Sequence, residues 1–414
     1  MAPAQRIVIV GGNLAGGAAA TTLRGEGFDG PLTIIGAEPW PPYERPPLSK
    51  GYVRGEEPRD KAFLHPDQWY ADHDVELMLG TRATRVDTEE RVVEVEGGGR
   101  VPFDKLLIAT GGRNRKVRAD GADLEGVHEL RTIEDADRIR EEAVAGRKAA
   151  IVGAGFIGSE VSASLRARGV EVEVVEFGPA PLVRVLGPDI SRVYEGIHRD
   201  HGVRFHFGEG VASFEGNGRV EALITDKGTR IDCDFAVVGV GIEPVTEVIE
   251  GTSIEVDNGV VVDEYCRTNV EGIFAAGDVA NHFHPVFGRR LRVEHWDNAL
   301  KQGAVAALNM LGRDEAFDDP HWFWSDQYEH NLQYVGHAIA WDDLVIRGSL
   351  EERDFVAFYV NQGMIDGVVG LDRGKQVRRA AALVKARTPV EPAVLRDEDV
   401  DLKKLGAELL GGRR

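Results

Sequence analysis

Cysteine is nearly absent from this sequence, which has only Cys233 and Cys266 among its 414 residues. The two cysteines are far apart, and neither belongs to a C-x-x-C pair or to another spacing typical of metal ligands. Their scarcity argues against a disulfide framework and against an iron–sulfur or zinc site built by this chain. The sequence therefore predicts no metal site of its own.

Long apolar runs are also missing. No stretch approaches the ~20 apolar residues that a membrane-spanning helix needs, and the first residues lack the basic and apolar regions of a signal peptide. The first strand is expected to begin at Arg6, which leaves no room for a cleavable leader. We therefore expect a cytoplasmic protein that makes no contact with membranes.

The sequence also lacks an excess of basic residues. Lys and Arg together number 49 against 69 Asp and Glu, which gives a formal net charge of −20. This balance disfavours nucleic acids and anionic membranes as partners. The rest of the composition, with 43% hydrophobic and 29% charged residues, is that of an ordinary globular protein, and the length suggests two to four domains.

The most informative stretch is a nucleotide-binding pattern over residues 149–176. An apolar strand leads into the spacing G-x-G-x-x-G, formed by Gly153, Gly155 and Gly158, and a helix and a strand ending at Glu176 follow. Such glycines allow a tight turn, close approach of the backbone to a pyrophosphate, and close helix–strand contact. The N–H groups at the helix start would face the phosphates, and the carboxylate of Glu176 would accept ribose hydroxyls. The alternative is a tight strand–helix turn without a ligand.

A second copy of this pattern occupies residues 6–38. It contains Gly11, Gly16 and, after the second strand, Glu38, while Asn13 stands where the middle glycine usually lies. Asparagine tolerates unusual backbone angles better than most residues, but its side chain must point away from the phosphates. A chain with two such units binds two dinucleotides, which suggests that electrons move between them.

A proline-rich segment, residues 39–50, follows the first unit. It is too rich in proline for a helix or a central strand, so we expect a rigid loop that projects Arg45 and Lys50 inward. On this evidence alone, Lys50 is better explained as a solvated residue than as a functional one.

Each nucleotide unit ends with an apolar strand that is followed by a glycine, where the chain leaves the unit. The first exit follows Thr110 and the second ends at Gly241. A further buried strand is expected before Gly277 and Asp278, with a helix beginning directly afterwards. There Asp278 could accept hydrogen bonds from sugar-alcohol hydroxyls, and the alternative is a simple helix N-cap.

Aromatic residues gather in the last third of the chain. Trp296 is expected in the first turn of a helix, and Trp324 lies in a segment that opens an alternating, strand-rich final region. An aromatic cluster usually belongs to a core, but polar neighbours of Trp324 allow it to line a cleft. The patterns together predict an α/β protein with two Rossmann-like dinucleotide-binding domains and a smaller α+β C-terminal domain.

Eight motifs extend this interpretation, because they occur together and in a fixed order. They are IVIVGGNLAGG, RPPLSK, LIATGG, LRTIEDA, IVGAGFIGSE, FAAGDVA, EHWDNA and FWSDQY. The ordered set resembles the FAD-containing ferredoxin reductases of bacterial oxygenase systems, the family of putidaredoxin reductase and biphenyl dioxygenase reductase. Apoptosis-inducing factor is a relative, and the wider fold is that of glutathione reductase.

The resemblance implies a division of the chain into three domains. An FAD-binding domain would comprise residues 1–112 and 243–322, with an NADH-binding domain at 113–242 and a C-terminal domain at 323–414. The expected assembly is a monomer or a weak homodimer.

The resemblance also assigns cofactor roles to residues at matching motif positions. Those implied for FAD are Gly11, Ala15, Glu38, Lys50, Ala83, Arg131, Asp278 and Trp296. Those implied for NADH are Gly153, Gly155, Gly158 and Glu176. Further cofactor-binding candidates are Asn13, Gly16, Arg45, Thr110, Trp324 and Gly241. Ala37 stands where some relatives have the ribose-binding acid, so Glu38 is its substitute here.

Two residues are implied as catalytic. Lys50 and Glu160 would form an ion pair beside the flavin ring, which reverses the interpretation of Lys50 as a solvated residue. Its positive charge would then lie near N5, where negative charge accumulates on reduction.

The implied function is electron transfer. NADH would pass a hydride to FAD, which would deliver single electrons to a [2Fe–2S] ferredoxin that serves an oxygenase or a cytochrome P450. Disulfide reductases of this fold need a C-x₄-C pair after the first nucleotide unit, which this sequence lacks. Two alternatives stay open: an NADH-dependent reductase of a small acceptor such as a quinone, and a redox-sensing binding protein like apoptosis-inducing factor.

Overall fold

The computed structural model describes residues 5–411, which form two compact units. The first unit contains residues 5–44, 59–113 and 242–321, and the second contains residues 45–58, 114–241 and 322–411. The second unit thus combines the predicted NADH-binding and C-terminal stretches with residues 45–58. The division into three functional domains stays a prediction.

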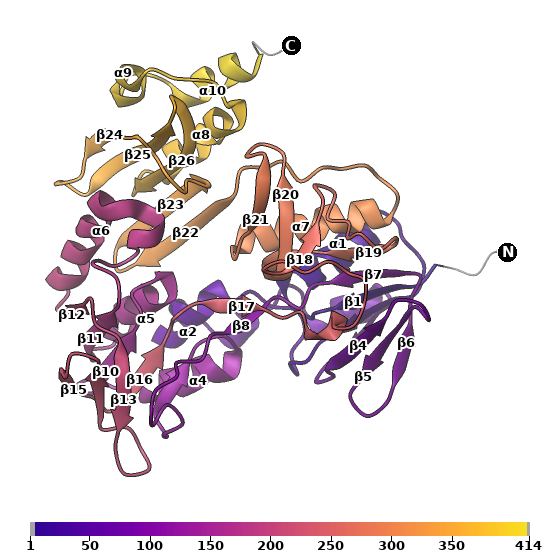
Figure 1. The fold of residues 1–414 in the computed structure, drawn as a ribbon, viewed down its shortest axis with the longest axis horizontal. Coiled ribbons are helices and arrows are strands. Elements are labelled where there is room, and N and C mark those ends of the chain that lie inside the picture. The colour runs from indigo at the N-terminus through magenta and orange to yellow at the C-terminus, as the bar shows by residue number, and fades with distance from the viewer. Residues whose placement is uncertain (1–4, 412–414) are drawn as a thin grey trace. The chain divides into compact units, whose positions relative to one another are not determined.

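A five-stranded parallel sheet forms the centre of the first unit (Figure 1). Its order is β19-β7-β1-β2-β3, and every neighbouring pair is parallel. The strands are β1 (Ile7–Val10), β2 (Leu32–Ile35), β3 (Val75–Met78), β7 (Lys105–Ile108) and β19 (Ile273–Ala275). This is a doubly wound order, in which ligands bind outside the carboxyl ends of the strands.

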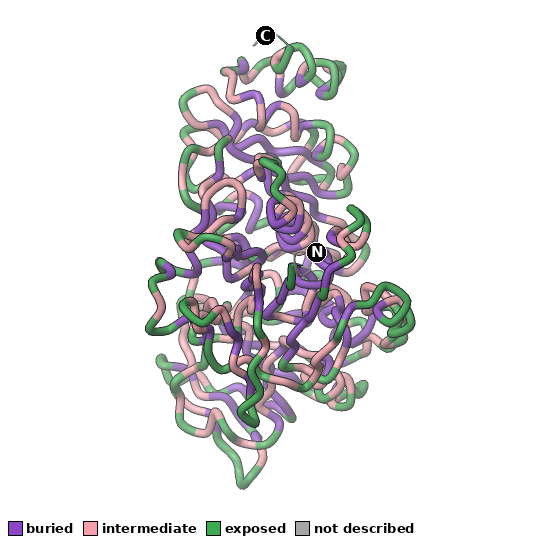
Figure 2. The backbone as a smooth tube through the Cα atoms, turned by 90° about the vertical axis from the view of Figure 1, so that its right-hand side faces the viewer, coloured by how far each residue is buried: buried purple, intermediate pink, exposed green. Residues whose placement is uncertain are grey.

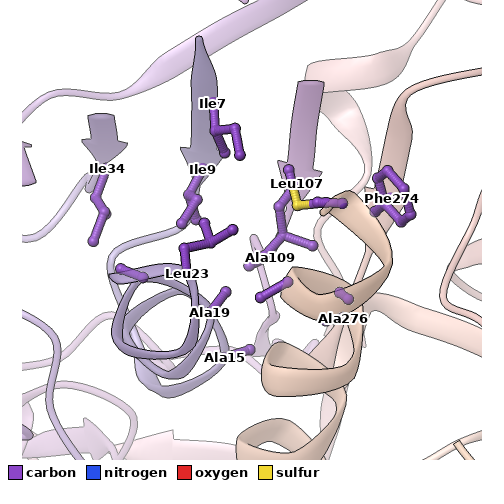
Figure 3. Packing of buried hydrophobic residues seen from close by; sticks show 14 of the residues in the cluster. Ile7, Ile9, Ala15, Ala19, Leu23, Ile34, Leu107, Ala109, Phe274 and Ala276 are labelled. Carbon is purple, nitrogen blue, oxygen red and sulfur yellow. The ribbon is translucent and has the colours of Figure 1, made fainter. Parts of the chain in front are cut away.

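Both faces of this sheet are buried, because successive residues of a strand point to opposite sides. Ile7 and Ile9 of β1 pack towards α1 (Leu14–Gly25) and α7 (Trp296–Met310), as Figure 3 shows for the α1 side. Val8 and Val10 belong to the hydrophobic cluster on the other face. That cluster includes residues of β4 (Ala83–Asp87), β5 (Val92–Val95), β18 (Val260–Val262) and β20 (Ala280–His284).

The second unit repeats the same plan. Its parallel sheet has the order β12-β11-β10-β16-β9. The strands are β9 (Val127–Glu129), β10 (Lys148–Val152), β11 (Glu171–Glu176), β12 (Arg204–Phe207) and β16 (Phe235–Val238). The helices of this part are α4 (Ile133–Glu142), α5 (Phe156–Ala167) and α6 (Val183–Asp200). Four strands of the two sheets correspond, β7-β1-β2-β3 and β16-β10-β11-β12, whereas the fifth strand comes from the end of the first unit (β19) and from the start of the second sheet (β9).

The last part of the second unit is a five-stranded antiparallel sheet, ordered β22-β23-β26-β25-β24. Its strands are β22 (Trp322–Gln327), β23 (His330–Gly336), β24 (Asp343–Ser349), β25 (Asp354–Asn361) and β26 (Met364–Leu371), followed by α8 (Gly374–Ala386), α9 (Pro392–Arg396) and α10 (Leu402–Gly411). Buried residues of α6 and of this sheet share one hydrophobic cluster, so the region is not an isolated module.

The remaining elements are short and connect these layers. The strands are β6 (Arg100–Pro102), β8 (Gly112–Asn114), β13 (Val211–Glu215), β14 (Ala222–Thr225), β15 (Arg230–Asp232), β17 (Ile242–Pro244) and β21 (Arg289–Arg292). The helices are η1 (Pro46–Ser49), α2 (Gly51–Arg54), η2 (Arg59–Ala62), α3 (Asp67–Asp72), η3 (Glu247–Ile249) and η4 (Gly277–Val279). Figure 2 shows the buried stretches in purple and the exposed turns in green. Among residues 5–411, no helix has the length and apolarity to cross a bilayer.

Two local predictions were wrong. The proline-rich loop contains the one-turn helix η1, because proline fits the first turn of a helix, where its missing N–H is not needed. The helix expected after Asp278 is only the single turn η4. It stops because the chain continues as β20, which pairs with β18 and β21.

His198 shows how closely α6 packs in the second unit. It is only 1% exposed, its Nε2 donates to Oε1 of Gln327 at 2.8 Å, and Tyr328 Oη donates to its Nδ1 at 2.9 Å. Burial lowers the pKa of His198 to about 4, so the folded protein keeps the ring neutral.

This burial predicts acid sensitivity. The unfolded chain binds a proton at His198 below about pH 6.5, while the folded chain does so only near pH 4, so stability falls as the pH drops between these values. The expected loss at pH 4 is about 3 kcal/mol for this residue. The free energy of unfolding, measured by denaturation at several pH values between 7 and 4, should fall less steeply for His198→Gln than for wild type. Replacement of the exposed His73 by Gln should leave the wild-type pH dependence unchanged. Equal slopes for wild type and His198→Gln would contradict the prediction.

Candidate functional site

The glycine loop of the second unit has the geometry of a phosphate-binding turn. Gly153 has a φ of +95°, and a Cβ there would lie 2.5 Å from the carbonyl oxygen of Gly239. A Cβ at Gly158 would overlap the carbonyl oxygen of Gly153. A Cβ at Gly155, in contrast, would meet no atom within 4 Å, so the loop is open where α5 begins. Two glycines serve packing, and the third leaves room for a ligand at the helix N-terminus.

Glu176 lies beside this loop, at the end of β11. Its Oε2 accepts a hydrogen bond from the N–H of Ala154 at 2.6 Å, and its Oε1 accepts one from the N–H of Gly178 at 2.6 Å. The two backbone donors fix the carboxylate next to the glycine turn. A carboxylate held in this way has further lone pairs for ribose hydroxyls, so the loop and the acid fit a dinucleotide.

The glycine loop of the first unit follows the same rules. Gly11 has a φ of +127°, and a Cβ there would overlap the carbonyl oxygen of Ala109. A Cβ at Gly16 would overlap the carbonyl oxygen of Gly11. Asn13, at the middle position, has an extended backbone with a φ of −116°, which any residue can adopt. The asparagine therefore fits without any unusual backbone angle, contrary to the reason given for it from the sequence.

The side chain of Asn13 points to Glu38. Its Nδ2 lies 3.5 Å from Oε1 of Glu38, whose Oε2 accepts a hydrogen bond from the Tyr43 hydroxyl at 2.5 Å. The first loop thus also has an acid beside it, although Glu38 lies three residues beyond the end of β2. This arrangement fits a second dinucleotide.

Other candidates of the first unit line its sheet edge and its helices. Ala15 is in the first turn of α1, where Gly303 of α7 packs so closely that a Cβ on it would overlap the Ala15 carbonyl oxygen. Ala83 begins β4. The Thr110 hydroxyl donates to the carbonyl oxygen of Val245 at 2.6 Å.

Asp278 and Trp296 complete the candidates of the first unit. Asp278 lies in η4, and its carbonyl oxygen accepts a hydrogen bond from Arg292 at 3.2 Å. Trp296 begins α7 and interacts electrostatically with Glu44, a residue that the sequence reasoning missed. Burial raises the pKa of the Glu44 carboxyl, and the neighbouring Trp296 indole opposes this shift.

In the second unit, the structure brings Arg45 and Arg131 together, because the Arg45 guanidinium donates to the Arg131 carbonyl oxygen. Gly241 has a φ of +94°, which suits a glycine exit. Trp324 lies on β22 and stacks on Trp322 with ring centroids 5.3 Å apart. These contacts locate the residues, and their cofactor roles stay predictions.

The predicted ion pair between Lys50 and Glu160 is present in the second unit. Lys50 Nζ lies 2.6 Å from Oε2 of Glu160, and the two side chains are 13% and 4% exposed. The same oxygen accepts from the Ser49 hydroxyl at 2.5 Å, and the other accepts from the Ser325 hydroxyl at 2.7 Å. The carboxylate is therefore buried with one cation and two hydroxyl donors.

Sequence reasoning missed both serines. Their signal was available, since Ser49 is the residue before Lys50 in RPPLSK and Ser325 is the serine of FWSDQY. Residues 45–58, α5 and β22 thus meet at one carboxylate. This arrangement can hold a positive charge in a fixed position in a site largely shielded from water.

Neither cysteine can serve as a redox thiol at neutral pH. Both are buried and outside any disulfide. Burial raises the pKa of Cys233 to about 12 and raises the pKa of Cys266 further. Since the thiolate is the reactive form, burial disfavours redox chemistry at either sulfur.

Comparison with known proteins places the chain among pyridine-nucleotide enzymes. Residues 5–303 match the family described as pyridine nucleotide-disulphide oxidoreductase, and residues 322–406 match the family described as reductase C-terminal. Rhodocoxin reductase of Rhodococcus erythropolis is 37% identical over 398 residues, which is 96% of this chain and 93% of that protein. Putidaredoxin reductase CamA of Pseudomonas putida is 34% identical over 407 residues, which is 97% and 96% of the two chains.

Solved structures agree with these matches. The reductase in the covalent putidaredoxin reductase–putidaredoxin complex superposes with a TM-score of 0.94 at 33% identity, covering 98% of this chain and 99% of that one. The ferredoxin reductase of the CYP199A2 system from Rhodopseudomonas palustris has a TM-score of 0.93 at 33% identity, covering 97% and 100%. The predicted fold class and the predicted family resemblance are both confirmed.

The burial of Glu160 predicts that removing only the cation of the pair destabilises the protein more than removing both charges. Lys50→Met leaves a buried carboxylate without its cation, so it should lower the free energy of unfolding by about 3–5 kcal/mol. The double variant Lys50→Met/Glu160→Gln removes both charges and should recover more than half of that loss. Chemical denaturation of wild type, both single variants and the double variant measures the coupling.

An exposed ion pair of the same unit provides the control. Arg353 pairs with Asp200, and these side chains are 31% and 60% exposed. Arg353→Met should therefore cost less than about 1 kcal/mol. A loss for Lys50→Met that is no larger than this would show that the buried pair does not stabilise the fold.

Proposed function

This chain belongs to the pyridine nucleotide-disulphide oxidoreductase family, and we propose that it is a flavoprotein that transfers electrons from NADH to a ferredoxin. The observation that carries this proposal is near full-length similarity to two proteins named as ferredoxin–NAD(+) reductases, in a chain whose two cysteines are both buried and outside any disulfide. The family has members that reduce disulfides, but here both thiols are buried and protonated. The electrons must therefore leave to an external acceptor.

In this proposal each unit binds one dinucleotide. FAD is assigned to the first unit, with its pyrophosphate at the loop from Gly11 to Gly16 and its ribose at Glu38. NADH is assigned to the second unit, with its pyrophosphate at Gly155 and its ribose at Glu176. Bound there, FAD would supply a centre that can take up a hydride from NADH and release electrons one at a time. The loops contribute by fixing the two cofactors, since most of the acceleration of such a step comes from proximity and orientation.

Lys50 is the side chain to which we assign an electrostatic role at the flavin ring. Its ammonium group is held by Glu160, which is itself held by the hydroxyls of Ser49 and Ser325. A cation fixed in this way needs no rearrangement when negative charge develops nearby. Glu160 acts as a positioning residue that sets the place and orientation of Lys50.

The acceptor is assigned from the relatives. Rhodocoxin reductase and the anthranilate 1,2-dioxygenase ferredoxin–NAD(+) reductase component are named for such systems, the latter being 36% identical over 97% of this chain. A small [2Fe–2S] ferredoxin is the one-electron carrier that this assignment implies, with an oxygenase or a cytochrome P450 beyond it. A cytoplasmic location, where NADH is supplied, belongs to the same proposal.

Steady-state turnover tests the function against its two alternatives. The protein, supplied with FAD and NADH, should reduce [2Fe–2S] ferredoxins from bacterial oxygenase systems at least about tenfold faster than it reduces quinones or oxygen. Faster reduction of a quinone would support the small-molecule reductase instead. Slow turnover with every acceptor, combined with an air-stable complex of NAD and flavin that dimerises, would support a redox-sensing binding protein.

Glu176 predicts a preference for NADH over NADPH. A carboxylate at the ribose repels a 2′-phosphate, so Glu176→Gln should narrow the ratio of kcat/KM values for the two cofactors by about tenfold, or ~1.4 kcal/mol. Glutamine keeps an acceptor for the N–H groups of Ala154 or Gly178. Glu173→Gln, a change of the same charge on the same strand, is the matched control and should leave the ratio unchanged. Equal use of both cofactors by wild type would contradict the prediction.

The charge on Lys50 predicts a kinetic effect that can be separated from stability. Lys50→Met/Glu160→Gln should slow the bleaching of flavin absorbance by NADH on the order of ten- to hundredfold, with FAD content unchanged. Glu160→Gln alone keeps the cation and should have a smaller effect. Stopped-flow absorbance measures both rates, and equal rates for wild type and the double variant would show that Lys50 has no role in the reaction.

A further inference from the structure

We propose that His282, His284 and His321 form a binding site for a divalent transition metal, with Zn²⁺ as the first choice. The site lies within the first unit and does not depend on the proposed reductase activity. Sequence reasoning searched for metal ligands among the cysteines and predicted none. The three histidines carry a different signal, which depends on the fold.

The fold brings the three rings together from two places in the chain. His282 and His284 are two residues apart on β20, so their side chains leave the same face of the strand. The strand is fixed on both sides, by parallel pairing of His282 with Val262 and antiparallel pairing of His284 with Arg289. His321 lies beyond the end of α7 and returns to this face.

One ring nitrogen from each histidine lies within 4.8 Å of the corresponding nitrogens of the other two. The centroid distances are 5.7 Å for His282–His284, 5.2 Å for His282–His321 and 4.8 Å for His284–His321. Tetrahedral Zn²⁺ with Zn–N distances of about 2.0–2.1 Å holds its nitrogens about 3.4 Å apart. Small rotations of the rings therefore bring the three nitrogens to a metal.

A contact between His284 and the main chain determines which ring nitrogen of His284 can coordinate the metal. Its Nε2 lies 2.9 Å from the carbonyl oxygen of Asp319, and a carbonyl oxygen can only accept a hydrogen bond. The hydrogen of the neutral ring is therefore on Nε2, which makes Nδ1 the nitrogen that can coordinate a metal. Metal-binding histidines typically have this arrangement, in which the second nitrogen donates to a carbonyl and fixes the ring.

The surroundings suit a neutral imidazole cluster. His282 and His284 are 0% exposed and His321 is 1% exposed. Phe317 packs against all three rings, with centroids 5.4–5.9 Å away. A packing role alone would be served as well by three aromatic hydrocarbons, whereas three ring nitrogens close to one another are what a metal requires. Three imidazole ligands without a thiolate suit Zn²⁺, Co²⁺ or Cu²⁺, and they leave a fourth position for another ligand.

Metal binding to the complete flavoprotein without an affinity tag tests the proposal. After treatment with a chelator, wild type should take up about one Zn²⁺ per chain, measured by competition with a chromophoric chelator and by elemental analysis. His282→Phe and His321→Phe keep the aromatic volume but remove a ligand, so each should weaken Zn²⁺ binding by at least about a hundredfold. Phe317→Leu changes the packing without removing a nitrogen and should bind Zn²⁺ within about threefold of wild type.

A spectroscopic measurement on wild type keeps the proposal testable if a variant does not fold. X-ray absorption of the Zn²⁺-loaded protein should show three imidazole nitrogens in the first coordination shell. FAD content and circular dichroism establish that each variant is folded. Uptake of less than about 0.2 Zn²⁺ per wild-type chain, affinity unchanged in both histidine variants, or a coordination shell without three imidazoles would each overturn the proposal.

Discussion

The structure depends on a steric constraint that occurs once in each unit, at the turn from β1 to α1 in the first unit and from β10 to α5 in the second. Gly11 and Gly153 have positive φ angles, and a Cβ on either would meet the carbonyl oxygen of a residue at the end of a neighbouring strand, Ala109 or Gly239. Because no side chain fits there, the helix starts directly at the carboxyl edge of the sheet. The start of the helix then lies at the edge where Glu38 or Glu176 is also found, so one packing requirement brings together both parts of each candidate dinucleotide site.

The second organising element is electrostatic. Glu160 is a buried carboxylate on α5 whose donors come from two other stretches of the second unit, with Lys50 and Ser49 from one stretch and Ser325 from the other. A buried charge is tolerated only when it is paired and hydrogen-bonded, so these stretches cannot separate without a large cost. The contact that holds residues 45–58 in the second unit is therefore the same contact that positions the cation assigned to the flavin. The stability of the second unit and the proposed function therefore depend on the same residues.

How far the sequence predicts this protein depends on how local each feature is. The strand, turn and helix around Gly153 and Gly158 were predicted to within a few residues, because their pattern is complete within residues 149–176. The prediction of a helix after Asp278 was wrong. That segment forms a strand by pairing with β18 and β21, and the sequence of the segment alone does not show these partners. The network of Glu160 joins residues 111 and 165 positions away. The family resemblance indicated the role of Lys50, whereas Ser49 and Ser325 were missed although both lie within the quoted motifs.

The histidine cluster is the extreme case of this limit. His282 and His284 have the two-residue spacing of a strand, but that spacing has meaning only if the segment is a strand, and the sequence predicted a helix there. On a helix, two residues with this spacing would point about 200° apart and could not share a metal. The pairing of β20 with its two neighbours both ends η4 at Val279 and turns these two rings to one face. The same pairing thus explains why the helix prediction was wrong and why the proposed metal site cannot be read from the local sequence.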